Sequence, residues 1–177
     1  MVKWPGSSPG HFFYNFKIGF IIAMALKSAG ILLYRITNKI LEVLLVHPGG
    51  PFWIKKDAGA WTIPKGELNK NEDPFDAAIR EMNEETGVTL KGEFIELTPV
   101  KQKAGKLVYA WAKEQDVDPA EIKSNEFEIE WPPKSGKKKS FPEIDKAAWF
   151  DIKTAKEKIN PGQLPLIEEL IIKLKSY

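Results

Sequence analysis

The chain has 177 residues, 43% of them hydrophobic, and its 26 basic and 24 acidic residues give a net charge of +2. This length and apolar content fit one compact domain. The small net charge provides no general attraction for DNA or an anionic membrane, so any anion must bind locally. The chain has no cysteine, which excludes disulfides, thiolate metal ligands and a cysteine nucleophile. Carboxylate oxygens are then the main ligand supply, and they favour hard cations.

Residues 1–27 are set apart as an N-terminal extension. Its apolar stretch, residues 12–26, is interrupted by Asn15 and Lys17 and is shorter than the about 20 residues that a membrane helix needs. Three interpretations stay open: an upstream extension or misassigned start, with Met24 as the true first residue; an ordinary packed segment; and a signal peptide with small residues at its cleavage site. No membrane partner is expected.

Segments rich in Leu, Ile, Val and aromatic residues lie on both sides of one central helix. The first two form a hairpin with Thr37-Asn38 as its turn. Strands are predicted at 29–36, 39–47, 60–68, 92–100, 106–113, 126–131 and 147–152, a polar loop at 132–142, and helices at 152–159 and 165–177. This order indicates an α/β fold, with a mixed sheet covered by helices in a single domain over residues 28–177.

The central helix is predicted at residues 74–86. Asp73 suits its N-cap, Pro74 its first position and Asp76 the acidic place of a capping box. Gly87 follows as the C-terminal stop. Apolar residues at helical spacing should form the buried stripe of this helix: Phe75, Ala78, Ile79 and Met82.

Three carboxylates crowd one side of this helix. Glu81, Glu84 and Glu85 fall within an arc of about 100°, beside the apolar stripe. Like charges held together at the edge of a core repel one another unless a cation neutralises them. Mg²⁺ binds a few carboxylates together with substrate phosphates. The cluster therefore predicts metal-assisted phosphate chemistry, and Arg80, one turn before Glu84, is placed to pair with it.

The surrounding residues follow the Nudix box, G-x5-E-x7-R-E-U-x-E-E-x-G-U, in which U is a bulky aliphatic residue. Gly66 and Glu72 begin the box, and the segment REMNEETGV at residues 80–88 completes it. The chain therefore resembles the Nudix hydrolases, through the box at 66–88 and in layout over about 28–177. The resemblance implies a Nudix-type α/β/α sandwich and metal-dependent attack of water on a diphosphate linkage.

The resemblance also implies roles for the residues of the box. Glu84 and Glu85 resemble the main ligands of a divalent metal, Mg²⁺ or Mn²⁺. Glu81 resembles a further ligand, or the base that takes a proton from the attacking water. Gly66 resembles the turn whose carbonyl approaches the metal. A bound metal suits this chemistry because it neutralises phosphate oxygens and lowers the pKa of water.

Further residues complete the expected site. Arg80 and Glu72 resemble the pair that fixes the loop of the box against its helix. Lys65, directly before the box, is placed to meet a substrate phosphate as a point charge. Glu143, in the segment FPEIDKAAWF, is either a late metal ligand, the base, or an acid of a surface turn. Asp145 is the second candidate for this late acid.

Several residues keep two interpretations. Trp53 and Trp111 either stack on a nucleobase or belong to the core. Glu126, Glu128 and Glu130 alternate along a strand, so they form either a solvated face or an extension of the acidic site. The lysines of the segment KSGKKK either steer a polyphosphate or an RNA 5′ end, or belong to a solvated loop.

The lead-in Trp-x-x-Pro-Lys-Gly, residues 61–66, resembles that of dinucleoside polyphosphate hydrolases more than that of the dGTP-cleaning branch, where a glycine usually replaces the lysine. The expected substrate is a small nucleotide such as diadenosine tetraphosphate. The alternatives are a house-cleaning nucleoside triphosphate pyrophosphatase, an RNA 5′-pyrophosphohydrolase, and a non-catalytic nucleotide-binding Nudix module. The cytoplasm is the expected location because nucleotides are there, and the oligomeric state is open.

Overall fold

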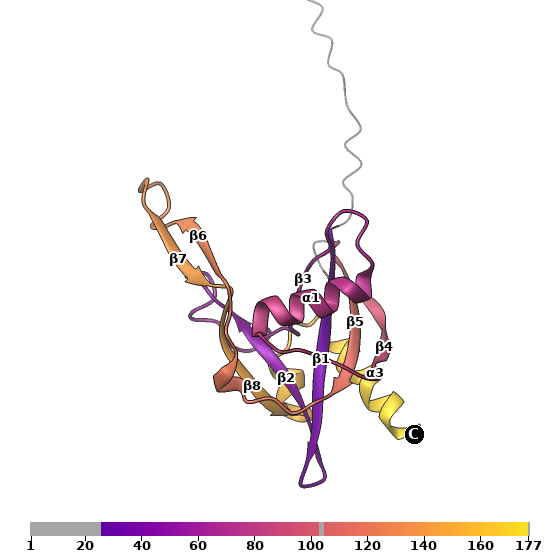
Figure 1. The fold of residues 1–177 in the computed structure, drawn as a ribbon. Coiled ribbons are helices and arrows are strands. Elements are labelled where there is room, and N and C mark those ends of the chain that lie inside the picture. The colour runs from indigo at the N-terminus through magenta and orange to yellow at the C-terminus, as the bar shows by residue number, and fades with distance from the viewer. Residues whose placement is uncertain (1–25, 103–104, 177) are drawn as a thin grey trace, which may run out of the picture.

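The computed structural model of the protein describes residues 26–102 and 105–176. The predictions for residues 1–25 lie outside these ranges and stay predictions. Within the described ranges, no helix is long and apolar enough to cross a bilayer. The elements form an α/β/α sandwich around a mixed sheet, which confirms the predicted fold class (Figure 1).

The main sheet of the described residues has six strands. Its order is β4-β5-β1-β2-β8, with β3 paired to β1 outside this path. The strands are β1 (Lys27–Thr37), β2 (Ile40–Pro48), β3 (Lys65–Glu67), β4 (Ile95–Lys101), β5 (Leu107–Glu114) and β8 (Ile144–Asp151). β1 runs parallel to β5, and the other pairs are antiparallel. The first half of β1 holds β3 and its second half holds β2, so the loop that starts the box is fixed to the central strand.

The turn between β1 and β2 lies one residue later than predicted. Asn38 and Lys39 form it, with φ of 52° and 67°, and Thr37 still pairs with Ile40. Two consecutive residues with positive φ suit the twist of a tight hairpin. Asparagine tolerates this conformation, whereas the β-branched Thr37 does not, so Thr37 stays in the strand.

Helix α1 (Pro74–Thr86) has the predicted bounds and caps. The Asp73 carboxylate accepts hydrogen bonds from the amides of Phe75 and Asp76, and Gly87 follows with a left-handed φ of 73°. The buried stripe is rotated slightly from the predicted one. Its fully buried members are Ala77, Ala78, Met82 and Thr86, while Phe75 and Ile79 are half-buried at its margin.

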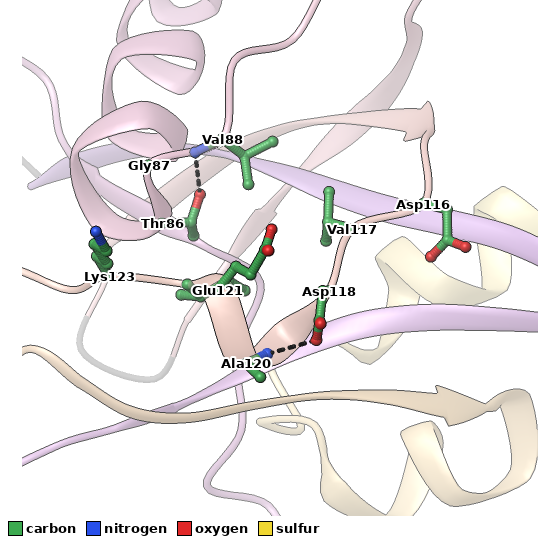
Figure 2. A pocket seen from close by; sticks show the side chains of 10 residues that line it. Thr86, Gly87, Val88, Asp116, Val117, Asp118, Ala120, Glu121 and Lys123 are labelled. Carbon is green, nitrogen blue, oxygen red and sulfur yellow. Dashed lines mark hydrogen bonds between the residues drawn. The ribbon is translucent and has the colours of Figure 1, made fainter.

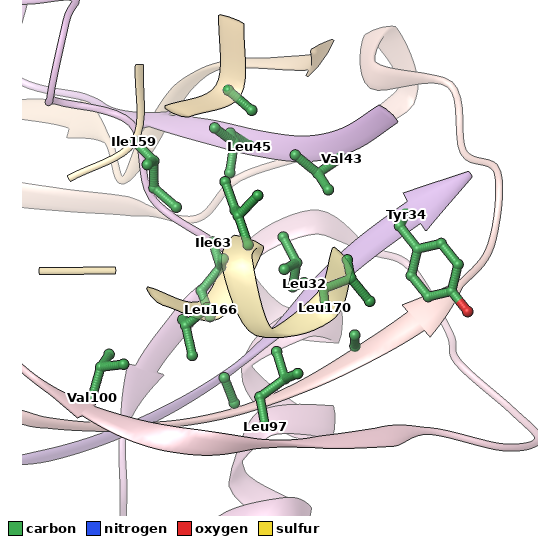
Figure 3. Close-up of a cluster of buried hydrophobic side chains, with 14 of the residues drawn as sticks. Leu32, Tyr34, Val43, Leu45, Ile63, Leu97, Val100, Ile159, Leu166 and Leu170 are labelled. Atoms are coloured by element: carbon green, nitrogen blue, oxygen red, sulfur yellow. The ribbon is translucent and has the colours of Figure 1, made fainter. Parts of the chain in front are cut away.

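Two apolar clusters lie on opposite faces of the sheet. α1 packs on one face, where Met82 is fully buried among residues of β1 and β2. On the other face lie α2 (Ile152–Lys158) and α3 (Leu164–Lys175). Leu166 and Leu170 of α3 are fully buried there against Leu32 and Leu45 of the sheet (Figure 3). Helices on both faces bury the middle of β1 and of β2.

A second, two-stranded sheet corrects the predicted polar loop. β6 (Glu126–Glu130) pairs with β7 (Lys138–Pro142), and the ribbon projects from the sandwich (Figure 1). Phe127 lies opposite Phe141, and this cross-strand contact stabilises the pairing of an otherwise polar segment. The three glutamates of β6 are exposed, so their solvated interpretation is the right one. A short 3₁₀ helix, Pro119–Glu121, precedes this ribbon.

Candidate active site

Gly66 brings β3 into direct contact with α1. A Cβ atom at this position would lie 1.8 Å from Oε2 and 2.0 Å from Cδ of Glu81. The Glu81 carboxylate therefore occupies the space that any larger residue would fill. The glycine at the start of the box is a packing requirement, because it lets an acidic side chain of the helix lie against the loop.

Arg80 ties the loop to the helix. Its Nε and one terminal nitrogen each donate to a Glu72 oxygen at 2.8 Å, and it also donates to the Glu67 carbonyl at 3.1 Å. The same side chain bonds Glu81 at 2.6 Å and Glu84 at 2.8 Å. These hydrogen bonds hold the pKa of Glu72 at about 2 and raise the pKa of Arg80. The predicted loop-to-helix pair is thus present in bidentate form.

Glu85 and Lys65 form the inner part of the site. The Glu85 carboxylate is half-buried and accepts a hydrogen bond from the Lys65 amide at 2.7 Å. Burial raises the pKa of Glu85 to about 7, against the opposing effect of the Lys65 ammonium. Burial also lowers the pKa of Lys65, and it raises the pKa of Glu81 against the effect of Arg80. Ionised groups are costly here, so a ligand that supplies the missing charges would be stabilised.

A pocket of about 320 Å³ joins residues that are distant in the sequence. Lys65 and Glu85 line it together with Trp53 and Glu143. The negative charge of Glu143 further raises the pKa of both Glu81 and Glu85. The remaining lining residues are Val46, Pro48, Ala60, Thr62, Gln102, Ile144 and Asn160. The late acid and the aromatic residue predicted for the site therefore share one pocket with the box.

The donor set of the pocket fits a hard divalent cation. Carboxylate oxygens are the ligands that Mg²⁺ and Mn²⁺ prefer, and Glu81 and Glu85 offer them beside Gly66. Glu84 has a side chain 47% exposed and would join them by leaving Arg80. Among residues 26–102 and 105–176, no group of three acidic or histidine side chains is already gathered for coordination. Arg80 and the Lys65 amide hold these carboxylates instead.

The structure gives the other candidates different positions. Trp111 packs its ring 5.1 Å from that of Phe75 and belongs to the core. Asp145 is hydrogen-bonded to Nδ1 of the buried His47 at 2.6 Å and does not line the carboxylate pocket. His47 was not predicted as a site residue, because nothing local in the sequence shows that its partner lies 98 residues away.

Gln102 and Asn160 are pocket residues that the sequence did not indicate. They follow β4 and α2 and meet the carboxylates only because the sheet and α2 bring these segments together. A neighbouring glutamine is structural: Gln163 accepts a hydrogen bond from the Ile63 amide at 3.0 Å within the core. No motif marks amides of this kind, which act through tertiary position.

A larger cavity of about 810 Å³ lies at the C-terminal end of α1 (Figure 2). Thr86 and Val88 form one side of it, with Lys123 beside Thr86, and Asp118 and Glu121 form the other. The Thr86 hydroxyl accepts a hydrogen bond from the Val88 amide at 3.2 Å, which shapes the exit of the helix. No predicted metal ligand lines this cavity, so its volume does not mark the reactive centre.

Comparison with known proteins agrees with the geometry. The model of the NUDIX domain matches residues 24–170. The rat bis(5′-nucleosyl)-tetraphosphatase [asymmetrical] is 30% identical over 118 residues, which are 60% of this chain and 71% of that protein. A Caenorhabditis elegans protein of the same name is 38% identical over 66 residues, covering 37% of this chain and 44% of its own length. The chain belongs to the Nudix family.

Solved structures show the same fold. A C. elegans Ap4A hydrolase in a binary complex has a TM-score of 0.57 at 22% identity, over 86% of this chain and all of that one. The NUDIX domain of Shewanella oneidensis NrtR, complexed with ADP ribose, has a TM-score of 0.58 at 17% identity, over 85% and 88%. The match to the NUDIX domain and the rat and C. elegans relatives, together with the complete box, identify the chain as a Nudix pyrophosphohydrolase. Nudix hydrolases generally need divalent metal ions.

Proposed function

We propose that this protein hydrolyses dinucleoside polyphosphates such as diadenosine tetraphosphate, with Mg²⁺ or Mn²⁺ as its metal, in the cytoplasm. The names of the rat and C. elegans relatives support this substrate class. The observation that carries the proposal is the shared pocket of Lys65, Glu85 and Glu143, which sets one ammonium among carboxylates. A polyphosphate needs this pairing, because its own negative charges repel an attacking hydroxide.

Lys65 and the carboxylates in and around the pocket have defined tasks in the proposal. Glu85, with Glu81 and Glu84, holds the metal, which when bound neutralises phosphate oxygens and lowers the pKa of the attacking water. Lys65 contacts a phosphate as a point charge. Glu81 or Glu143 accepts the proton of the water as its oxygen bonds to phosphorus. The bridging P–O bond breaks, and diadenosine tetraphosphate plus water gives ATP and AMP.

Turnover of a substrate panel tests the proposal. The panel contains dinucleoside polyphosphates, nucleoside triphosphates, nucleotide sugars and 5′-triphosphorylated RNA, each with Mg²⁺ and with EDTA. We expect the dinucleoside polyphosphates to stand well above the rest, only with metal, and to yield ATP and AMP from the tetraphosphate. Pyrophosphate released fastest from a nucleoside triphosphate or an RNA 5′ end would replace this substrate by one of those two.

Glu85→Gln is the matched control for the panel. It preserves the shape of the side chain and can still accept the hydrogen bond from the Lys65 amide, but it removes one metal-binding charge. We expect at least about a 100-fold loss of turnover. Substituting a residue that only hydrogen-bonds to a metal ligand already lowers metal affinity or activity about 10- to 100-fold. Turnover at the parent rate would refute the metal assignment. A folded parent protein that binds nucleotide without turnover would be a binding module.

A further inference from the structure

A third cavity, of about 680 Å³, lies beside the carboxylate pocket on the other side of the loop at residues 50–56. We call it the aromatic cleft. Its lining residues are Gly50, Pro51, Phe52, Ile54, Lys55, Lys56, Trp131, Lys139, Phe141, Pro142 and Asp145. They come from the loop after β2, from the β6–β7 ribbon, which projects from the sandwich, and, for Asp145, from the start of β8 (Figure 1).

The aromatic cleft exposes apolar side chains that the fold does not need. Phe52 and Ile54 are 61% and 69% exposed, and neither belongs to the buried core. The Phe52 ring lies 5.6 Å from that of Trp131, edge to face, and Phe141 borders the same cavity. Exposed apolar groups gathered in this way mark a binding surface. Flat aromatic faces are the surfaces on which nucleobases stack.

The charge of the aromatic cleft favours an anion. Lys55, Lys56 and Lys139 line it and are exposed, and the Lys139 ammonium lies 5.3 Å from the Phe141 ring centroid. Its one acidic lining residue, Asp145, already bonds His47. Aromatic faces beside unopposed ammonium groups match a ligand that combines a base with phosphates.

The loop at residues 50–56, together with Pro142 and Glu143, separates the aromatic cleft from the carboxylate pocket, and we call these residues the wall. Trp53 lines the pocket, while its neighbours Phe52 and Ile54 line the cleft, so successive side chains of the loop face opposite sides. Pro142 and Glu143 divide in the same manner. The loop and the Pro142–Glu143 segment therefore lie between the two cavities. A polyphosphate that occupies both has to pass over these residues.

The wall is anchored at both ends. Nε2 of His47 donates to the Lys56 carbonyl at 2.8 Å, and its Nδ1 bonds Asp145 at 2.6 Å, with the ring fully buried. The Gly49 amide donates to the Glu143 carbonyl at 2.9 Å, and a Cβ on Gly49 would lie 2.0 Å from the Pro142 carbonyl oxygen. The loop and the ribbon therefore keep a fixed spacing between the two cavities.

The size of the carboxylate pocket leaves part of the proposed substrate outside it. About 320 Å³ is at the low end for a small-molecule site, whereas a dinucleoside polyphosphate has a nucleoside at each end. We propose that the aromatic cleft binds the second nucleoside of the substrate, its base against Phe52 and Trp131 and its nearest phosphate beside Lys139. This inference rests on the proposed function and adds a site for the far end of the same substrate.

Two substrates that differ in the second nucleoside test the inference. Diadenosine tetraphosphate has it, and adenosine 5′-tetraphosphate lacks it; the KM of each, or the inhibition constant of the second, is measured for Phe52→Ala, Trp131→Ala and Lys139→Ala. We expect each aromatic variant to raise the KM for the dinucleotide about tenfold relative to the value for the mononucleotide, the loss of one base stack. Lys139→Ala should raise the same ratio and weaken its salt dependence.

Matched controls come from α3, which lies on the far side of the sheet from α1. Ile172 is 65% exposed and Lys175 is exposed. Ile172→Ala removes an exposed apolar side chain and Lys175→Ala removes an exposed lysine, so neither variant should alter the KM of either substrate. Thermal unfolding confirms that the Phe52→Ala and Trp131→Ala variants are folded. A KM ratio equal to that of the parent in both aromatic variants would overturn the inference while the proposed function stands. Parent protein that turns over neither substrate with Mg²⁺ would overturn both.

Discussion

Glu85→Gln should make the metal-free protein more stable at alkaline pH while it abolishes most of the activity. The Glu85 carboxylate is half-buried, and burial raises its pKa from 4.5 to about 7. A glutamine keeps the volume and accepts the Lys65 amide hydrogen bond, which is 2.7 Å long in the parent. It cannot ionise, so it removes the cost of a charge that only a bound cation would offset.

The magnitude follows from linkage. Between pH 4.5 and 7 the Glu85 carboxyl keeps its proton in the folded protein and loses it in the unfolded chain. The free energy of unfolding therefore falls as pH rises through this window and levels off above it. The difference between a pKa of 4.5 and one of about 7 corresponds to at most about 3 kcal/mol. For a domain of this size that is about 6–12 °C in Tm.

Urea unfolding in EDTA at pH 5 and pH 8 measures the effect. The parent protein should lose up to about 3 kcal/mol between these pH values through Glu85. The variant should keep only the dependence due to other groups, Glu81 among them. Added Mg²⁺ should restore stability at pH 8 in the parent more than in the variant, since it binds the ionised site. Equal pH dependence in the two proteins would refute the reasoning, because Glu85 would then titrate normally.

Gly66→Ala should lower kcat at least about tenfold, because its Cβ would displace the Glu81 carboxylate; an unchanged kcat would show that this contact is dispensable. Asp73→Ala should cost about 1 kcal/mol of stability and about 2–4 °C in Tm by removing the N-cap of α1, with kcat as the check that the site is intact. His47→Ala should cost about 2 kcal/mol in urea unfolding, because it removes the buried imidazole and the hydrogen bond that it makes to the Lys56 carbonyl; stability equal to that of the parent would contradict this.

The parts of the fold that depend on local chemistry were predictable from the sequence. The bounds of α1 follow from Asp73, Pro74 and Gly87, each of which acts within one turn of the helix end. The loop-to-helix pair of Arg80 and Glu72 was predictable because the box fixes its spacing. The metal-binding roles of the box residues remain predictions that the experiments above address.

Features that depend on distant pairing were not predictable. The β7 strand is polar and lysine-rich, and only its pairing with β6, through Phe127 and Phe141, makes it a strand. The turn of the first hairpin was misplaced by one residue because the positive φ of Lys39 leaves no compositional signal. The same holds for the aromatic cleft, whose residues come from two segments about 80 positions apart that only the folded chain unites.

The five hydrogen bonds of Arg80 explain how the acidic helix α1 stays folded without a bound metal. The guanidinium bonds Glu72, Glu81 and Glu84 at once, so it acts as an internal counterion for the acidic helix. We expect the chain to fold in a metal-poor environment, unlike small domains whose folding energy comes from the ion. An incoming cation must compete with this arginine, and a substrate that brings its own metal and phosphates competes best. Catalytic assembly would then be triggered by the substrate rather than by the metal supply.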